Sequence, residues 1–100
     1  MEKYTKLVRD KIPKILDEKG IPYQKEIARS EEMKAWLMLK LEEEMAEFKE
    51  AKNVEELADI LEVIKALQNL PEFSDLESVR QKKAEERGGF EQGIILTGEK

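Results

Sequence analysis

Two amphipathic stretches, separated by a short break, most constrain how this chain can fold. Apolar residues recur with helical spacing over about Glu31 to Lys52 and again over about Val54 to Leu70. Ser30 is the expected N-cap of the first helix, and Asn53 with Glu56 matches a capping box at the start of the second. Because the connection is so short, we expect the two helices to be antiparallel neighbours.

Shorter segments flank this predicted hairpin, and 100 residues suffice for one domain spanning residues 1–100. The other expected elements are a helix over about Asp10–Lys19, a strand over Ile21–Ile27, a helix that opens at the capping-box pattern Ser74–Glu77 and ends near Arg87, and a strand over Phe90–Thr97. The predicted fold class is therefore mainly α: an antiparallel bundle of about four helices with two short peripheral β-strands.

Composition excludes several kinds of chemistry. The chain contains neither Cys nor His, so it has no disulfide, thiolate nucleophile, imidazole base or His-ligated metal. Any catalysis must use carboxylates, Lys, Arg, hydroxyls and a hard cation such as Mg²⁺, Mn²⁺ or Ca²⁺. A net charge of -5 argues against binding to nucleic acid or an anionic membrane surface. With no membrane-length apolar run and no hydrophobic signal region, the protein is expected to be soluble and cytoplasmic.

Acidic residues fall on the apolar sides of both predicted hairpin helices. Glu44 lies inside the apolar arc of the first helix and Glu47 at its edge, while Glu56 and Asp59 occupy similar positions on the second. Four ionised carboxylates near one turn would repel one another and lose hydration, and a divalent cation relieves both costs. The pattern therefore predicts a Mg²⁺ site, with Mn²⁺ as an alternative, held by Glu44, Glu47, Glu56 and Asp59.

A plainer interpretation stays open at this point, because acidic residues make up 23 of the 100 positions. Glu56 can serve only to close the capping box, and Asp59 can be favoured simply by the positive end of its helix.

The spacing of these acids resembles a known signature. Residues 43–47 (Glu-Glu-Met-Ala-Glu), followed by residues 56–59 (Glu-Leu-Ala-Asp), resemble the EExxE…ExxD pattern of the MazG-like all-α nucleoside triphosphate pyrophosphatases. Residues 6–13 and 83–90 are similar to the opening and closing segments of a small subgroup described as phosphoribosyl-ATP pyrophosphohydrolase-like. The resemblance touches most of the chain, although only eight residues separate Glu47 from Glu56, fewer than in many members.

This resemblance implies Mg²⁺-dependent hydrolysis of a nucleoside triphosphate to the monophosphate and pyrophosphate, as clearance of unwanted nucleotides. It also implies assembly as a homo-oligomer, either a dimer or a tetramer. Glu43 and Glu44 are the candidate catalytic residues, and Glu43, which the helical wheel turns outward, is expected to activate water or support a ligand. Two alternatives remain: a phosphoribosyl-ATP pyrophosphatase of histidine biosynthesis, and a non-catalytic helical oligomerisation or interaction module.

Basic residues are also needed if the site takes a triphosphate, because one cation cannot neutralise all of its charge. The candidate phosphate-binding residues are Lys6 and Arg9 near the N-terminus and Arg80, Lys83 and Arg87 along one face of the last predicted helix. The same side chains can instead pair with acidic residues of the chain itself.

Overall fold

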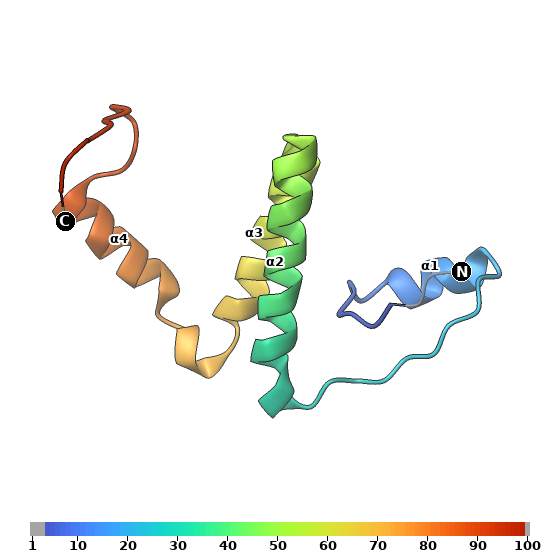
Figure 1. Cartoon of the computed structure of the whole chain (residues 1–100). Helices are drawn as coiled ribbons and strands as arrows, with labels where there is room; N and C mark the ends of the chain where they lie inside the picture. Colours follow the sequence, from blue (N-terminus) through green and yellow to red (C-terminus); the bar gives the residue numbers. More distant parts are fainter. Residues whose placement is uncertain (1–3, 100) are drawn as a thin grey trace.

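The structure is a computed structural model, and it describes residues 4–99. These residues form four α-helices, α1 (Ile12–Glu18), α2 (Met33–Ala51), α3 (Val54–Gln68) and α4 (Leu76–Arg87), with two 3₁₀ turns, η1 (Ser30–Glu32) and η2 (Pro71–Phe73). Helices α2 and α3 lie antiparallel and side by side, while α1 and α4 stand away on opposite sides of them (Figure 1). The mainly α class and the central hairpin are confirmed. None of the helices in the described chain is both long and apolar enough to cross a lipid bilayer.

The turn between α2 and α3 follows from the backbone at two residues. Lys52 ends α2 in the left-handed region, with φ 53°, and its N–H donates to the carbonyl of Phe48 at 2.8 Å. Asn53 is extended, and its side-chain oxygen accepts from the N–H of Glu56 at 3.0 Å. The predicted N-cap is therefore confirmed. This turn sets the first turns of α3 beside the last turns of α2.

Two other predicted caps are wrong, because charged side chains offer stronger partners. Ser30 begins η1, where the N–H of Arg29 donates to the carboxylate of Glu32 at 3.0 Å. Glu77 was expected to close a capping box, but it accepts from the guanidinium of Arg80 at 2.6 Å. Such charge-assisted bonds to a guanidinium are roughly twice as strong as neutral ones, which explains why Glu77 binds Arg80 and leaves the cap.

The two predicted strands, Ile21–Ile27 and Phe90–Thr97, are not seen, and residues 4–99 contain no strand. A strand needs a backbone partner along its edge, and these segments lie on opposite sides of the hairpin (Figure 1). Pro22 also removes one backbone donor from the first segment, and Gly93 turns the second with φ 61°. The alternation of apolar residues suggested a strand in each segment, but it does not show whether another segment lies close enough to pair with it.

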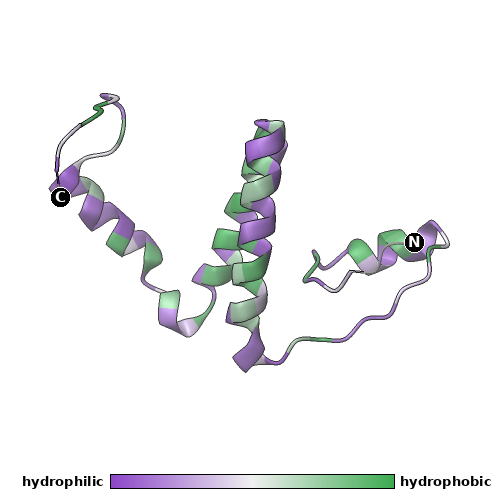
Figure 2. Cartoon of the chain, viewed as in Figure 1, coloured by the Kyte–Doolittle hydropathy of each residue, from purple (hydrophilic) through white to green (hydrophobic). Residues whose placement is uncertain are grey.

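The core of the single chain is small. Leu37 and Val63, exposed by 3% and 7%, are the buried hydrophobic residues of the described part. The radius of gyration is 17.7 Å, against about 13 Å for a compact chain of this length. The accessible surface is 9545 Å², against about 5,900 Å² for a compact monomer of this mass. Figure 2 shows that much of the hydrophobic sequence belongs to the hairpin, whereas α4 is mostly hydrophilic.

Candidate metal centre

Five acidic residues gather where the end of α2 passes the start of α3. Glu43, Glu44 and Glu47 form one group, and Glu44, Glu56 and Asp59 form a second; in each group, one carboxylate oxygen per residue lies within 4.8 Å of the others. Glu44 belongs to both groups and links them. Three of the four predicted metal ligands, Glu47, Glu56 and Asp59, therefore lie near the fourth, Glu44, although Glu47 is not in the same close group as Glu56 and Asp59.

Glu44 is the buried member of this acidic cluster. Its exposed fraction is 5%, and its Oε1 lies 3.2 Å from Nζ of Lys40. Its other oxygen, Oε2, has no hydrogen-bond partner in the described chain, and the same holds for Oε2 of Glu56. A buried carboxylate oxygen without a partner destabilises the fold, and two in one cluster make a set of donors that a hard cation suits.

The local structure explains why Glu56 turns inward. The side chain of Asn53 already accepts from the N–H of Glu56, so the start of α3 is capped. The carboxylate of Glu56 makes no return bond to Asn53 among the described residues, and it lies beside Glu44 instead. The Glu56 side chain therefore does not act as a capping-box residue. The bond from the backbone N–H of Glu56 to the side chain of Asn53 caps the helix without it.

The electrostatic environment separates Glu44 from Glu43. Burial raises the pKa of Glu44 above its ordinary value; Lys40 opposes this rise and the charge of Glu47 adds to it. Burial also acts to raise the pKa of Glu43, but hydrogen bonds from Lys6 and Lys40 outweigh it and lower the pKa below its ordinary value. Glu43 thus has enough neighbouring positive charge, whereas Glu44 does not.

The five candidate phosphate-binding residues divide into two sets. Nζ of Lys6 donates to Oε1 of Glu43 at 2.9 Å, and Nη2 of Arg9 donates to Oδ1 of Asp59 at 2.6 Å. The other three, Arg80, Lys83 and Arg87, lie on α4, which stands apart from the hairpin (Figure 1). Within one chain, only the N-terminal pair is therefore next to the acidic cluster.

Lys40 is a site residue that the sequence analysis missed. Its Nζ lies 3.2 Å from Glu43 and 3.2 Å from Glu44, and its side chain is only 15% exposed. The signal was present in the sequence, because Lys40 stands three and four residues before these acids and such pairs meet on a helix.

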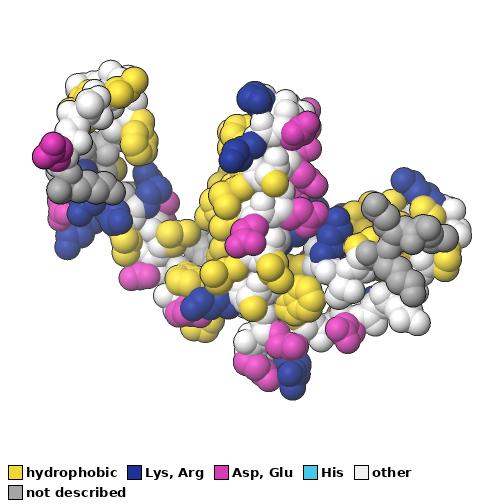
Figure 3. All heavy atoms as spheres, in the orientation of Figure 1, with side chains coloured by type: hydrophobic (Ala, Val, Ile, Leu, Met, Phe, Trp, Pro, Cys, Tyr) yellow, Lys and Arg dark blue, Asp and Glu magenta, His cyan; other side chains and the backbone are white. Residues whose placement is uncertain are grey.

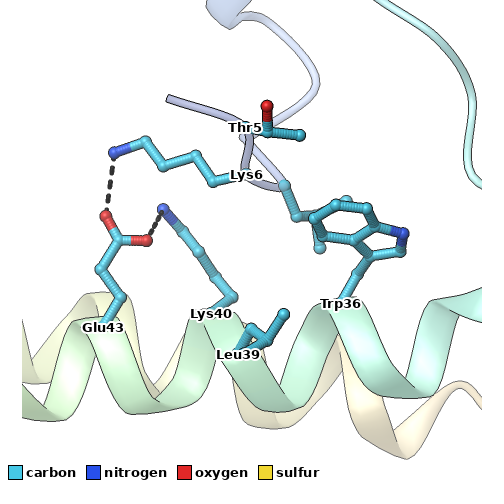
Figure 4. A pocket seen from close by; sticks show the side chains of 7 residues that line it. Thr5, Lys6, Trp36, Leu39, Lys40 and Glu43 are labelled. Atoms are coloured by element: carbon cyan, nitrogen blue, oxygen red, sulfur yellow. Dashed lines mark hydrogen bonds and ion pairs between the residues drawn. The ribbon is translucent and has the colours of Figure 1, made fainter. Parts of the chain in front are cut away.

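A small cavity lies beside the cluster, between the N-terminal segment and α2 (Figure 4). Its volume is about 40 Å³, and it is lined by Thr5, Lys6, Leu7, Trp36, Leu39, Lys40 and Glu43. Sites for small organic ligands usually measure about 300–1,000 Å³. As it stands, this space is too small for a nucleotide.

No family model, no curated protein and no solved structure matches this chain.

Replacing Glu44 by Gln should stabilise the protein when no metal is present. At pH 8 in EDTA, we expect Glu44→Gln to raise the free energy of unfolding by about 1 kcal/mol, which is about 4–8 °C in Tm. The raised pKa means that charged Glu44 destabilises the fold above that pKa, and this cost disappears as the pH falls through it. The gain should therefore shrink with acidification, as measured by thermal unfolding between pH 8 and pH 4.

The matched control is Glu42→Gln, which removes one charge from an exposed position on the same helix. A rise in Tm of equal size in both variants at pH 8 would show that net charge, and not the burial of Glu44, sets the effect.

Proposed function

We propose that this protein is a Mg²⁺-dependent nucleoside triphosphate pyrophosphohydrolase, which cleaves the triphosphate to a monophosphate and pyrophosphate. The supporting observation is the buried Glu44, whose Oε2 has no partner among residues 4–99 while acids from both helices lie beside it. A solvated acidic face needs no ligand, but a buried carboxylate with one oxygen left unpartnered beside other acids favours a further cation in addition to Lys40. The set of oxygen donors fits Mg²⁺, and Mn²⁺ is an acceptable substitute.

Different residues of the cluster have different proposed roles in this reaction. Glu44, Glu47, Glu56 and Asp59 hold the divalent cation, which when bound neutralises phosphate charge and favours attack of water on the α-phosphorus. Glu43 lies at the rim of the cluster, where its two oxygens accept hydrogen bonds from Lys6 and Lys40, and its proposed role is to activate the attacking water or to support a metal ligand. The bond between the α- and β-phosphates breaks, and pyrophosphate leaves.

The cations next to the cluster suit the rest of the triphosphate charge. Lys6 and Arg9 are within one side-chain length of the acids, since each already binds one of them. Arg80, Lys83 and Arg87 remain candidates only if a second chain brings α4 to the cluster. The removal of unwanted nucleotides is the proposed role in the cell, and the cytoplasm is the proposed location.

A second substrate, phosphoribosyl-ATP, fits the same cluster. It carries the same kind of bond between α- and β-phosphates, so the acids and the cation would act in the same way. A direct comparison of turnover separates this alternative from general hydrolysis of nucleoside triphosphates.

The uncovered apolar surface favours a homo-oligomer, which we propose as a dimer or a tetramer. An open groove of about 450 Å³ runs along α3 and is lined by Val54, Leu57, Ala58, Ile60, Leu61 and Ile64. Figure 3 shows apolar side chains on the side of the hairpin turned toward α4, and acidic side chains on the side turned toward the N-terminal segment. The accessible surface exceeds that of a compact monomer by roughly 3,600 Å², more than the ~800 Å² per partner of a standard interface.

The same surface also favours the third alternative, a helical oligomerisation module without catalysis. In that case the acidic cluster would bind no metal, and the exposed face of α3 would be the functional surface. Metal-dependent stability and turnover distinguish this module from the enzyme.

Pyrophosphate release should require both Mg²⁺ and Glu44. We expect release from at least one member of a panel of nucleoside triphosphates and phosphoribosyl-ATP, and no release in EDTA. Glu44→Gln should lower the rate by at least about 100-fold, because the central metal ligand is lost. Glu42→Gln changes an exposed acid that belongs to neither group of the cluster, so this variant should keep the rate.

Two results would contradict this assignment. Release that persists in EDTA would exclude a metal-dependent reaction. No release from any substrate, together with no effect of Mg²⁺ on Tm, would leave the interaction module as the better account.

Charge on the α3 groove should dissociate the proposed oligomer. Leu61 is 54% exposed in the single chain, so Leu61→Glu costs little in a monomer but buries a charge in an interface. In sedimentation experiments we expect wild type at two or four times 11.7 kDa and Leu61→Glu at the monomer mass. Ile95→Glu, at an exposed position outside the groove, is the control. Wild type that sediments as a monomer at micromolar concentration would contradict the oligomer.

A further inference from the structure

Residues 4–9, the N-terminal arm, connect both helices of the hairpin through two cations. Lys6 binds Glu43 on α2, and Arg9 binds Asp59 on α3, although these partners lie 37 and 50 positions away in the sequence. Figure 4 shows Lys6 and Lys40 both directed toward the carboxylate of Glu43. The arm is therefore attached on two sides of the acidic cluster.

Each acid that the arm binds belongs to a different group of the cluster. Glu43 is in the group with Glu47, and Asp59 is in the group with Glu56; Glu44 is in both. Neither Lys6 nor Arg9 reaches the buried Oε2 atoms, which stay without a partner in the described chain. The arm thus adds positive charge at the rim, while at the centre Lys40 pairs with Oε1 of Glu44 and leaves its Oε2 without a partner in the described chain.

A count of formal charges shows what is missing. Five carboxylates make up the cluster, and three cations, Lys6, Arg9 and Lys40, are paired with them. The difference is two negative charges, which is the charge that one divalent cation supplies. Lys6 and Arg9 therefore leave the cluster short of positive charge, and this shortage draws a divalent cation to it.

Binding such an ion brings it into competition with the arm. Glu43 and Asp59 offer oxygens that lie within 4.8 Å of other members of their groups, so an ion at the centre draws on the same charge that holds Lys6 and Arg9. Both ion pairs are solvent-exposed on the cation side, and exposed pairs are weak and easily exchanged. The small cavity under the arm also cannot admit a ligand until the arm moves.

We propose that the N-terminal arm is an exchangeable cover: Lys6 and Arg9 occupy Glu43 and Asp59 in the metal-free protein and leave them when a divalent cation enters. The released cations are then free to bind the phosphates of the substrate beside the metal. This inference rests on the proposed metal-dependent function and assigns the arm a regulatory part in it. Metal and arm exclude each other at the rim, so the arm opens the site only when the ion is present.

Trp36 provides a direct readout of the position of the arm. It is the single tryptophan of the chain, and it lines the small cavity together with Thr5, Lys6 and Leu7 (Figure 4). Movement of the arm changes the contacts of the indole ring, and therefore its emission and its access to a quencher.

The experiment titrates Mg²⁺ alone, without nucleotide, into wild type and into Lys6→Met/Arg9→Met. Trp36 emission and acrylamide quenching report on the arm, and calorimetry reports on the affinity for the ion. In wild type, we expect Mg²⁺ to change the emission and to increase quenching. In the double variant, we expect metal affinity to be about 3- to 10-fold higher, because the competing cations are absent, and the emission to be insensitive to Mg²⁺.

Lys11→Met/Lys14→Met is the matched control, since it removes the same charge from exposed positions nearby that form no ion pair in the described chain. If Mg²⁺ binds and its affinity is equal in the two double variants, the proposed role of the arm is wrong, but the metal site stands. A wild-type Trp36 signal that ignores bound Mg²⁺ would lead to the same conclusion. No Mg²⁺ binding to any of the three proteins would overturn both the arm and the proposed function.

Discussion

The burial of one carboxylate, Glu44, is the constraint on which the rest of the site depends. The helical repeat places Glu44 on the side of α2 that packs against α3, and within residues 4–99 its ion-pair partner is Lys40 of the same helix. The α2–α3 turn then adds Glu56 and Asp59 to the same space. The protein thus gathers negative charge around one buried carboxylate, which destabilises the hairpin unless positive charge offsets it.

Positive charge can reach the cluster from Lys40, from the N-terminal arm and from the proposed divalent cation, and these differ in how strongly they are held. Lys40 is part of α2 and cannot leave, while Lys6 and Arg9 belong to the N-terminal arm and are exposed. Exposed ion pairs contribute about 0.2–1 kcal/mol each, whereas a ligand at 100 times its Kd contributes about 2.7 kcal/mol. In the proposed exchange, a divalent cation at that concentration would outweigh the two arm contacts, so the arm is the component expected to move.

The local features of the site could be predicted from the sequence, and the long-range ones could not. Asn53 as a cap and the inward faces of Glu44 and Glu56 follow from the helical repeat and from the short turn. Helical spacing cannot place the arm, so Glu43 was expected to point outward, yet it is half-buried with Lys6 and Lys40 around it. The expected strands failed for a similar reason, since their pairing depends on segments that the chain does not bring together.

The position of α4 away from the hairpin also could not be predicted from the sequence. Its basic face and the apolar groove on α3 were both visible as patterns, but a pattern does not say whether a helix packs on its own chain or on another. In the single chain the groove stays open and α4 stands away, so the fold is complete only around the α2–α3 hairpin. The cluster lies at the best-packed part of the molecule, which suits a site that must hold its geometry.

The central claim is that a divalent cation binds at Glu44, and its most direct test is paramagnetic broadening of backbone amide signals by Mn²⁺. Substoichiometric Mn²⁺ is expected to broaden the amides of residues 43–47 and 56–59 first, because these residues surround Glu44. Broadening that is spread evenly over the acidic residues, or that is centred on exposed pairs such as Glu85 and Glu86, would contradict it.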